Sequence, residues 1–342
     1  KKTLNLFINI EFFIKRLIVL IFRNNFKIKF KENFIFPMIG INRIYGIEKI
    51  NLDLINYDQI KKFEINYNLL NLSQETMKFC EEKIYKFGFS KNDKIVCLHV
   101  RDGDFRQDEH RKTYRNSDIN NYLSTIQYLT EQGYKVVRLG KSSNKELKIK
   151  NKNFFDYTFS NIKEDILDLY FIYKCSFYIG TQSGVLDVAQ MFNKPILITN
   201  MCELFTSFPR KSFDRGIFKK IISKKTGKEV QIKKFAEMDF KYHDPQVEIF
   251  DLEFKENTPQ EILDATKEFI NDCIDKNLIN KKNKIQEDFN SFIRSRYRLF
   301  YENDFENYHS IKKQEDALKM IRIFKSFNGA LCKSYLKNNY TL

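Results

Sequence analysis

The sequence predicts an α/β fold in which helices cover both faces of a parallel β-sheet. Between residues 94 and 200, short β-branched apolar runs alternate with segments of helical periodicity. Strands that alternate with helices pair in parallel, because each crossover helix returns the chain to the same end of the sheet. The chain has 342 residues, 42% hydrophobic and 15% aromatic, and can therefore bury a large core.

The elements follow one another in a regular order. The first clear helix covers residues 73–88, where Ser73 provides a capping hydroxyl and Gly88 a stop. The region after it predicts strands over 94–100, 135–140, 153–159, 176–180 and 195–200, and helices over 117–133, 162–175 and 183–192.

The rest of the chain is less regular. Residues 200–257 have a loopier and more basic pattern, residues 258–274 predict a capped helix, and residues 284–326 predict further helices that close the fold. We therefore expect three parts, which are an N-terminal domain over 1–92, a Rossmann-like domain over 93–280 and a C-terminal helical segment over 281–342.

An apolar segment opens the N-terminal domain at residues 4–22. Glu11, Lys15 and Arg16 interrupt it, and the apolar stretch that remains is too short to span a bilayer. No small-residue cleavage site follows, so the segment is not a typical signal peptide. We favour a helix packed within this domain, and the alternative is a helix that lies on a membrane surface. The chain begins at Lys1, as expected for a truncated N-terminus.

The chain is basic, with 59 Lys and Arg against 44 Asp and Glu and a formal charge of +15. Such a charge raises nucleic acid or an anionic membrane as a partner. However, the lysines are scattered, and abundant Lys, Asn, Ile and Phe without any Trp are typical of an A+T-rich genome. We therefore expect no nucleic-acid partner, and a weak attraction to anionic substrates.

The cysteines and histidines form no metal motif. The six cysteines are far apart and several lie in apolar runs, which is typical of buried thiols in a reducing compartment. The four histidines show no HExxH spacing. We expect no metal and no cofactor, and a cytoplasmic location with peripheral contact to the inner membrane as an option.

Two polar stretches follow predicted strands. "HVRDGDF" brings His99, Arg101 and Asp104 to the end of the first strand, and "YIGTQSGV" turns a later strand into a helix. Ligands of doubly wound sheets bind at the carboxyl ends of the strands. Glycines and hydroxyls at a helix start expose N–H groups that favour phosphate, and an arginine adds a planar fork of donors. We therefore expect Arg101 to share a diphosphate clamp with Gly180, Thr181, Gln182, Ser183 and Gly184.

These residues resemble a known family. "HVRDGDF" fits the H-x-R-x-x-D pattern of the fucosyltransferase-like superfamily of GT-B glycosyltransferases. Together with "YRNSDINNYLSTIQYLTEQGYKVVRLG", "YIGTQSG" and "NTPQEILDATKEF", it resembles more closely a bacterial family of glycosyltransferases associated with surface-polysaccharide gene clusters. The resemblance covers roughly residues 94–270, and the motifs keep their order.

The resemblance implies a GT-B architecture, in which two Rossmann-like domains face a cleft and the N-terminal one lies on the acceptor side. By position, Arg101 matches the arginine that binds the donor's diphosphate, His99 the histidine that shapes that pocket, and Asp104 the closing acid. Thr181 and Ser183 match the turn that meets the donor's phosphates. Asp102 stands where many fucosyltransferases have a second arginine, so the donor is a nucleotide-sugar whose identity stays open, GDP-fucose included.

This chemistry suits the residues. Negative charge builds on the departing nucleoside diphosphate, and a fixed guanidinium with helix N-terminal amides stabilises it without a metal ion. Asp104, Glu109 and His110 are the candidates for deprotonating the acceptor hydroxyl. Arg101, His99 and Asp104 are accordingly the predicted catalytic residues.

Two more arginines are predicted to contact the donor. Arg115 follows the first motif and is expected to bind phosphate or an acidic acceptor, and Arg138 ends the second strand of the same rim. The expected acceptor is a glycan or a lipid-linked glycan. The basic run over residues 210–228 is expected to face solvent.

Other interpretations stay open. "DGD" at residues 102–104 is similar to the metal-binding DxD motif of GT-A enzymes, although an adjacent arginine would compete with the ion. Asp-Gly also favours a simple turn, and Thr181 and Ser183 are also typical helix caps. The alternative functions are a nucleic-acid-binding basic protein and a non-catalytic module that binds a nucleotide or carbohydrate.

Overall fold

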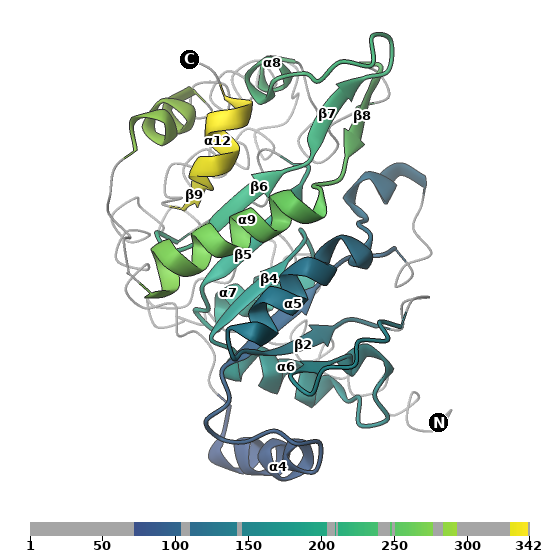
Figure 1. Cartoon of the computed structure of the whole chain (residues 1–342), viewed down its shortest axis with the longest axis vertical. Helices are drawn as coiled ribbons and strands as arrows, with labels where there is room; N and C mark the ends of the chain where they lie inside the picture. The colour runs from purple at the N-terminus through teal and green to yellow at the C-terminus, as the bar shows by residue number, and fades with distance from the viewer. Residues whose placement is uncertain are drawn as a thin grey trace, which may run out of the picture. The chain divides into compact units, whose positions relative to one another are not determined.

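A parallel β-sheet of seven strands forms the centre of the computed structural model, which describes residues 72–103, 110–141, 146–203, 209, 211–238, 247, 250–275, 283–292 and 329–340. The strands lie in the order β3-β2-β1-β4-β5-β6-β9, and every neighbouring pair is parallel (Figure 1). They are β1 (Ile95–His99), β2 (Lys135–Leu139), β3 (Phe154–Phe155), β4 (Phe177–Gly180), β5 (Ile196–Met201), β6 (Arg215–Phe218) and β9 (Ala330–Leu331). The predicted α/β fold class is confirmed.

The direction of strand addition reverses between β1 and β4. From β1 the chain adds β2 and β3 on one side, then returns to place β4 against β1 and adds β5 and β6 on the other side. Doubly wound sheets open a crevice at such a reversal, beyond the carboxyl ends of the strands. The topology therefore directs attention to His99 and Gly180, the last residues of β1 and β4.

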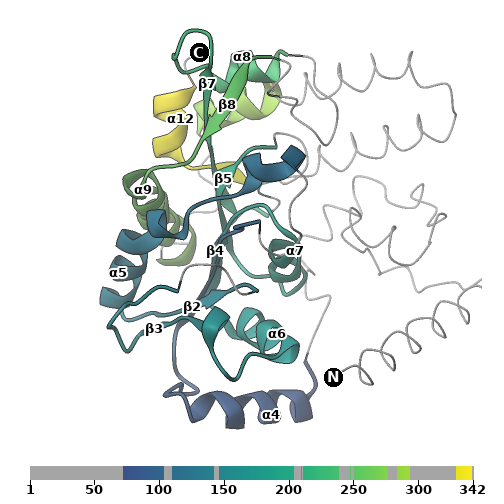
Figure 2. The ribbon, with the colours of Figure 1, turned by 90° about the vertical axis from the view of Figure 1, so that its right-hand side faces the viewer.

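Helices cover the sheet on both faces, as Figure 2 shows. α5 (Leu123–Glu131) and α9 (Pro259–Phe269) pack on one face, and α6 (Asp165–Lys174) and α7 (Gly184–Met191) pack on the other. α4 (Gln74–Tyr85) packs against α6.

The position of β1 between these two helical layers explains why its sequence is apolar from Ile95 to Leu98. Cys97 and Ile95 join the core beneath α6 and α7, whereas Val96 and Leu98 join the core beneath α5 and α9. A strand buried on both faces has an uninterrupted apolar sequence instead of an alternating one. Burying such a side chain stabilises the fold by about 1.5–3 kcal/mol.

The predicted helix ends are largely correct. The Ser73 hydroxyl accepts from the N–H of Thr76 at the start of α4. Thr258 and Glu261 cap α9 reciprocally, as a capping box. The helix expected over 117–133 begins instead with a 3₁₀ turn, η3 (Ile119–Tyr122), before α5.

Residues 200–257, the stretch with the loopier pattern, hold only short helices and strands in their described part. This region contributes β6 to the main sheet, and also β7 (Lys220–Ser223), α8 (Ile232–Ala236) and β8 (Leu252–Lys255). β7 and β8 form a separate antiparallel pair. No strand was predicted at β6, because its sequence RGIF begins with arginine and glycine although the strand is buried throughout.

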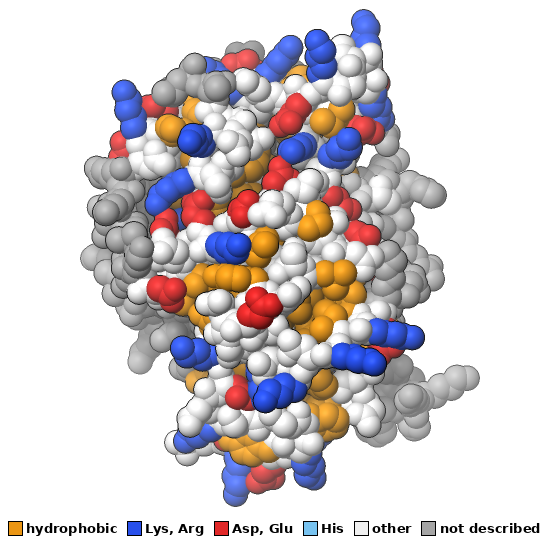
Figure 3. Space-filling view, viewed as in Figure 1, with side chains coloured by type: hydrophobic (Ala, Val, Ile, Leu, Met, Phe, Trp, Pro, Cys, Tyr) orange, Lys and Arg blue, Asp and Glu red, His pale blue; other side chains and the backbone are white. Residues whose placement is uncertain are grey.

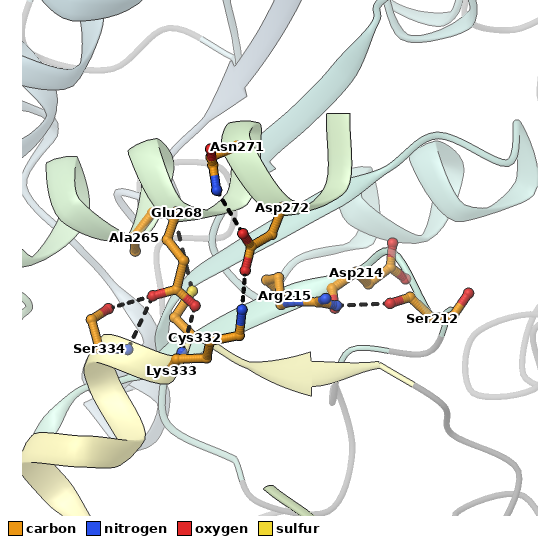
Figure 4. Close-up of polar contacts among 10 residues, drawn as sticks. All are labelled: Ser212, Asp214, Arg215, Ala265, Glu268, Asn271, Asp272, Cys332, Lys333 and Ser334. Carbon is orange, nitrogen blue, oxygen red and sulfur yellow. Dashed lines mark hydrogen bonds and ion pairs between the residues drawn. The ribbon is translucent and has the colours of Figure 1, made fainter. Parts of the chain in front are cut away.

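Residues 329–340 complete the sheet and one helical layer. β9 pairs with β6, and α12 (Lys333–Asn339) follows it. Figure 4 shows how α9 and the π-helical segment after it, η5 (Ile270–Asp275), hold this segment. The Glu268 carboxylate of α9 accepts from the N–H groups of Lys333 and Ser334, at 2.5 and 3.0 Å, and Asp272 of η5 pairs with the Lys333 ammonium. A carboxylate of another helix thus caps the N-terminus of α12.

Several predictions fall wholly or partly outside the described residues. These are the apolar segment over 4–22, most of the helices over 284–326 and, apart from α4 and the turn that follows it, the N-terminal domain over 1–92. The boundaries at 92 and 280 stay predictions. In the described part of the chain, no helix is both long and apolar enough to span a bilayer. All six cysteines are buried and free of disulfides, as their apolar surroundings predicted.

Candidate functional site

The ends of β1 and β4 are tied together at the reversal point of the sheet. His99 lies opposite Gly180, and the N–H of Thr181 donates to the His99 carbonyl at 3.1 Å. The N–H of Arg101 then donates to the Thr181 hydroxyl at 2.9 Å. A Cβ on Gly180 would lie only 2.5 Å from the His99 carbonyl oxygen, so only glycine permits this approach.

The turn after β4 leads into α7 without a side-chain cap. Ser183 occupies the N-cap position, but its hydroxyl lies 3.2 Å from His99 Nδ1 and caps no helical N–H group. A Cβ added to Gly184 would meet no described atom within 4 Å. The first turn of α7 therefore has no side-chain cap and has open space beside Gly184, and the positive end of the helix dipole there favours an anion.

Three cationic side chains gather beside this turn from separate elements. Arg101 Nη1 donates to the Asn116 side-chain oxygen, and Lys219 Nζ donates to the Asn116 carbonyl at 2.5 Å. Arg115 Nη2 donates to the Gln182 carbonyl at 3.0 Å. Lys219, which follows β6, is only 2% exposed, and this burial lowers the pKa of its ammonium group. The rim is therefore strongly positive near Arg101.

Gln182 fixes the end of β5 to the same turn. Its side-chain oxygen accepts from the N–H groups of Cys202 and Glu203, at 2.9 and 3.2 Å, and its amide nitrogen donates to the Glu203 carbonyl at 3.2 Å. The Glu203 carboxylate lies 3.7 Å from Arg115 Nε and accepts from the Tyr114 hydroxyl at 3.3 Å. Glu203 thus partly balances the charge of the arginines.

The His99 imidazole has a low pKa, to which the cations of the site contribute. Burial, and after it the nearby charges of Lys163, Arg101 and Arg138, lower its pKa to about 4. The imidazole is therefore neutral at neutral pH and available as a hydrogen-bonding partner of Ser183. The same cations that disfavour a protonated imidazole favour a bound anion.

Arg138 lies on β2, the strand next to β1. Its guanidinium forms an ion pair with Asp156 at 2.9 Å, and the residue is 4% exposed. It also lies 5.8 Å from the centre of the Phe159 ring. Arg138 therefore organises the neighbouring strand ends, one strand away from the Arg101 cluster.

The structure brings most of the predicted site together. One rim collects His99, Arg101, Arg115, Gly180, Thr181, Gln182, Ser183 and Gly184, and Arg138 lies on the adjacent strand. Asp104, Glu109 and the side chain of His110 lie outside the described residues. The parts that these residues play in catalysis and binding stay predictions.

Sequence analysis missed four contributors to the rim, which are Asn116, Lys163, Glu203 and Lys219. Lys219 follows a strand that was itself missed, and Lys163 lies among ordinary loop residues. The position of Glu203 just after β5 was the one available signal, because strand ends of this sheet carry the site.

The described residues contain no group of three or more His, Cys, Asp or Glu side chains placed to hold a metal ion. Asp102, the first acid of the DGD stretch, is exposed, and the second lies outside the described residues.

Neither a protein-family model nor a curated protein matches this sequence. Among solved structures, it is similar to the crystal structure of the glycosyl transferase family 9 from Veillonella parvula DSM 2008, with 14% sequence identity and a TM-score of 0.30. The similarity covers 38% of this chain and 36% of that one, so it spans little more than a third of that protein's length. A similarity of this extent does not identify an activity.

Proposed function

We propose that this protein is a glycosyltransferase that moves a sugar from a nucleotide-sugar donor to a glycan acceptor. The observation that carries the proposal is the hydrogen bond between Arg101 and Thr181, which unites the H-x-R motif and the α7 turn at the reversal point of the sheet. The positive helix end, the open space beside Gly184 and the neighbouring cations are the features that a diphosphate requires.

The donor's diphosphate lies, in this proposal, between Arg101 and the first turn of α7. Glycosyl transfer breaks the bond between the sugar and the diphosphate, so negative charge grows on the departing oxygen. Donors that are already in position stabilise that charge more than the ground state, without a metal ion. Neutral His99 holds the Ser183 hydroxyl and thereby keeps it from capping α7.

The finer assignments extend this proposal. GDP-fucose is one candidate donor, the acceptor is a glycan or a lipid-linked glycan of a bacterial surface polysaccharide, and the protein acts at the cytoplasmic side of the inner membrane. Asp104 is the proposed acid at the end of the H-x-R-x-x-D block.

On the face of the molecule that Figure 3 draws, the distribution of charge does not favour the nucleic-acid alternative. On the face drawn in Figure 3, Lys and Arg side chains are spread out, and Asp and Glu lie among them. A nucleic-acid-binding surface instead concentrates cations in a stripe that follows the phosphate backbone. Steeply salt-dependent binding of an oligonucleotide, without any response to nucleoside diphosphates, would reverse this preference.

A thermal-shift experiment tests the proposal. GDP, UDP, CDP and ADP are added in turn, with and without magnesium, and one of them is expected to raise the melting temperature. Arg101→Ala is expected to abolish the rise, whereas Lys228→Ala, which removes an exposed charge after β7, keeps it. If no diphosphate stabilises well-folded protein, the proposal fails.

Two further measurements separate the alternatives. Strict dependence on magnesium would favour the metal-binding interpretation of residues 102–104. Release of the nucleoside diphosphate from a nucleotide-sugar, followed by mass spectrometry, separates an enzyme from a module that binds without turnover.

A further inference from the structure

An exposed aromatic ring lies at the same end of the sheet as the anion site. Phe159 ends η4 (Tyr157–Phe159), the turn that follows the carboxyl end of β3, and its side chain is 41% exposed. The two residues before it are buried, Tyr157 at 0% and Thr158 at 5% exposure. The ring is therefore presented to solvent by a well-anchored turn.

Hydrogen bonds hold this turn in place. The Tyr157 hydroxyl donates to the Glu164 carbonyl at 2.9 Å and accepts from the Glu164 N–H at 2.8 Å. The Thr158 hydroxyl donates to the Arg138 carbonyl at 3.4 Å. The Arg138 guanidinium, itself paired with Asp156, lies 5.8 Å from the centre of the Phe159 ring. An attraction between this cation and the ring restricts the orientation of Phe159.

The register of the strands places the ring at a useful separation from the phosphate clamp. Leu139, the last residue of β2, pairs with His99, and a Cβ on the following Gly140 would lie 3.4 Å from the Thr158 hydroxyl. The turn therefore adjoins the end of β2, one strand from β1 and two from β4. Strands lie about 4.8 Å apart, so the ends of β2 and β4 are roughly 10 Å apart along the edge of the sheet. This separation matches the span of a nucleoside whose diphosphate is bound at α7.

We propose that Phe159 is the platform on which the nucleobase of the donor stacks. The inference rests on the proposed function, because it needs a diphosphate bound by Arg101 and α7. Every base has a flat π-face that stacks on an aromatic ring, and removing one such ring weakens binding by about tenfold or more. Stacking alone tolerates any base, so Phe159 contributes affinity and holds the nucleoside in register.

The chain contains no tryptophan, which permits a direct optical test. Phe159→Trp introduces a single indole at the proposed platform, and its fluorescence is expected to be quenched by GDP, UDP, CDP or ADP but not by inorganic pyrophosphate. The matched control is Tyr128→Trp, because Tyr128 also has a cation over its ring, Lys267 at 5.3 Å, but lies on α5, on the face of the sheet opposite to α7. Its fluorescence is expected to stay unchanged with every ligand.

Affinities measured by calorimetry complete the test. Phe159→Ala is expected to weaken the nucleoside diphosphate by about tenfold and leave inorganic pyrophosphate unchanged, Phe159→Trp to keep both affinities, and Arg101→Ala to weaken both ligands. Equal nucleotide affinity in Phe159→Ala and wild type, with loss in Arg101→Ala, overturns the platform and leaves the proposed function standing. If wild-type protein binds no nucleoside diphosphate, the proposed function fails and the platform fails with it.

Discussion

The backbone N–H of Arg101 donates a hydrogen bond of 2.9 Å to the Thr181 hydroxyl, across 80 positions of sequence. Thr181 is fully buried and its own N–H donates to the His99 carbonyl, so it links the ends of β1 and β4 through two atoms. The Thr181 hydroxyl therefore helps to hold the Arg101 backbone, whose carbonyl also accepts from the Ser117 N–H at 2.9 Å.

Thr181→Val is expected to lower the free energy of unfolding by about 1–3 kcal/mol, because it leaves the Arg101 N–H without this acceptor. Urea unfolding measures the change. The control is Thr125→Val: Thr125 is also fully buried, but its hydroxyl has no hydrogen-bond partner among the described residues. That variant is expected to keep or gain stability, and equal losses in both would contradict the role given to the Thr181 hydroxyl.

Gly180→Ala is expected to destabilise the fold by about 1–3 kcal/mol, because the new methyl group would force β1 and β4 apart at His99. Gly184→Ala has no such neighbour and is expected to be neutral or slightly stabilising in α7. Thermal denaturation of the two variants compares them directly. A tolerated Gly180→Ala would show that the strand ends can separate at little cost.

Gly184→Glu is expected to weaken nucleoside-diphosphate binding without lowering the stability of the fold. A carboxylate in the first turn of α7 interacts favourably with the helix dipole, by about 0.3–1 kcal/mol, so the melting temperature is expected to stay equal or rise. The same carboxylate would occupy the open space and repel phosphate, so nucleoside-diphosphate affinity is expected to fall at least tenfold. Unchanged nucleoside-diphosphate affinity, measured by calorimetry, would show that the diphosphate does not bind at this end of α7. Gly184→Gln controls for size without charge.

The low pKa of His99, about 4 in the folded protein against roughly 6.5 in an unfolded chain, makes stability depend on pH. Between these values the unfolded state binds a proton that the folded state does not, so stability falls as the pH falls. From about pH 7 to about pH 4.5, wild type is expected to lose about 2 kcal/mol more than His99→Gln. Urea unfolding at both pH values measures the difference, and equal losses would contradict the buried, neutral imidazole.

The core of the fold, and the meeting of the β1 and β4 ends at one edge of the sheet, could be predicted from the sequence for physical reasons. β1 and β4 are buried on both faces, so their apolar runs were clear, and the polar residues that follow them had to share one edge of a parallel sheet. β6 was missed because its sequence begins with arginine and glycine, and Gly216 is required there since a Cβ would lie 2.5 Å from the Met201 sulfur. Lys219 and Asn116 were missed because only tertiary structure brings them together.

The position of β9 in the sheet has a consequence for synthesis on the ribosome. β6 leaves the ribosome before β9, the strand that pairs with its outer edge, because β9 comes from residues 330–331, far downstream of β6. Until then a nascent chain exposes the unpaired N–H and C=O groups of β6, which are a template for association with other chains. A polypeptide arrested before residue 330 is therefore expected to rely on chaperones, because the outer edge of β6 stays unpaired until β9 has been synthesised.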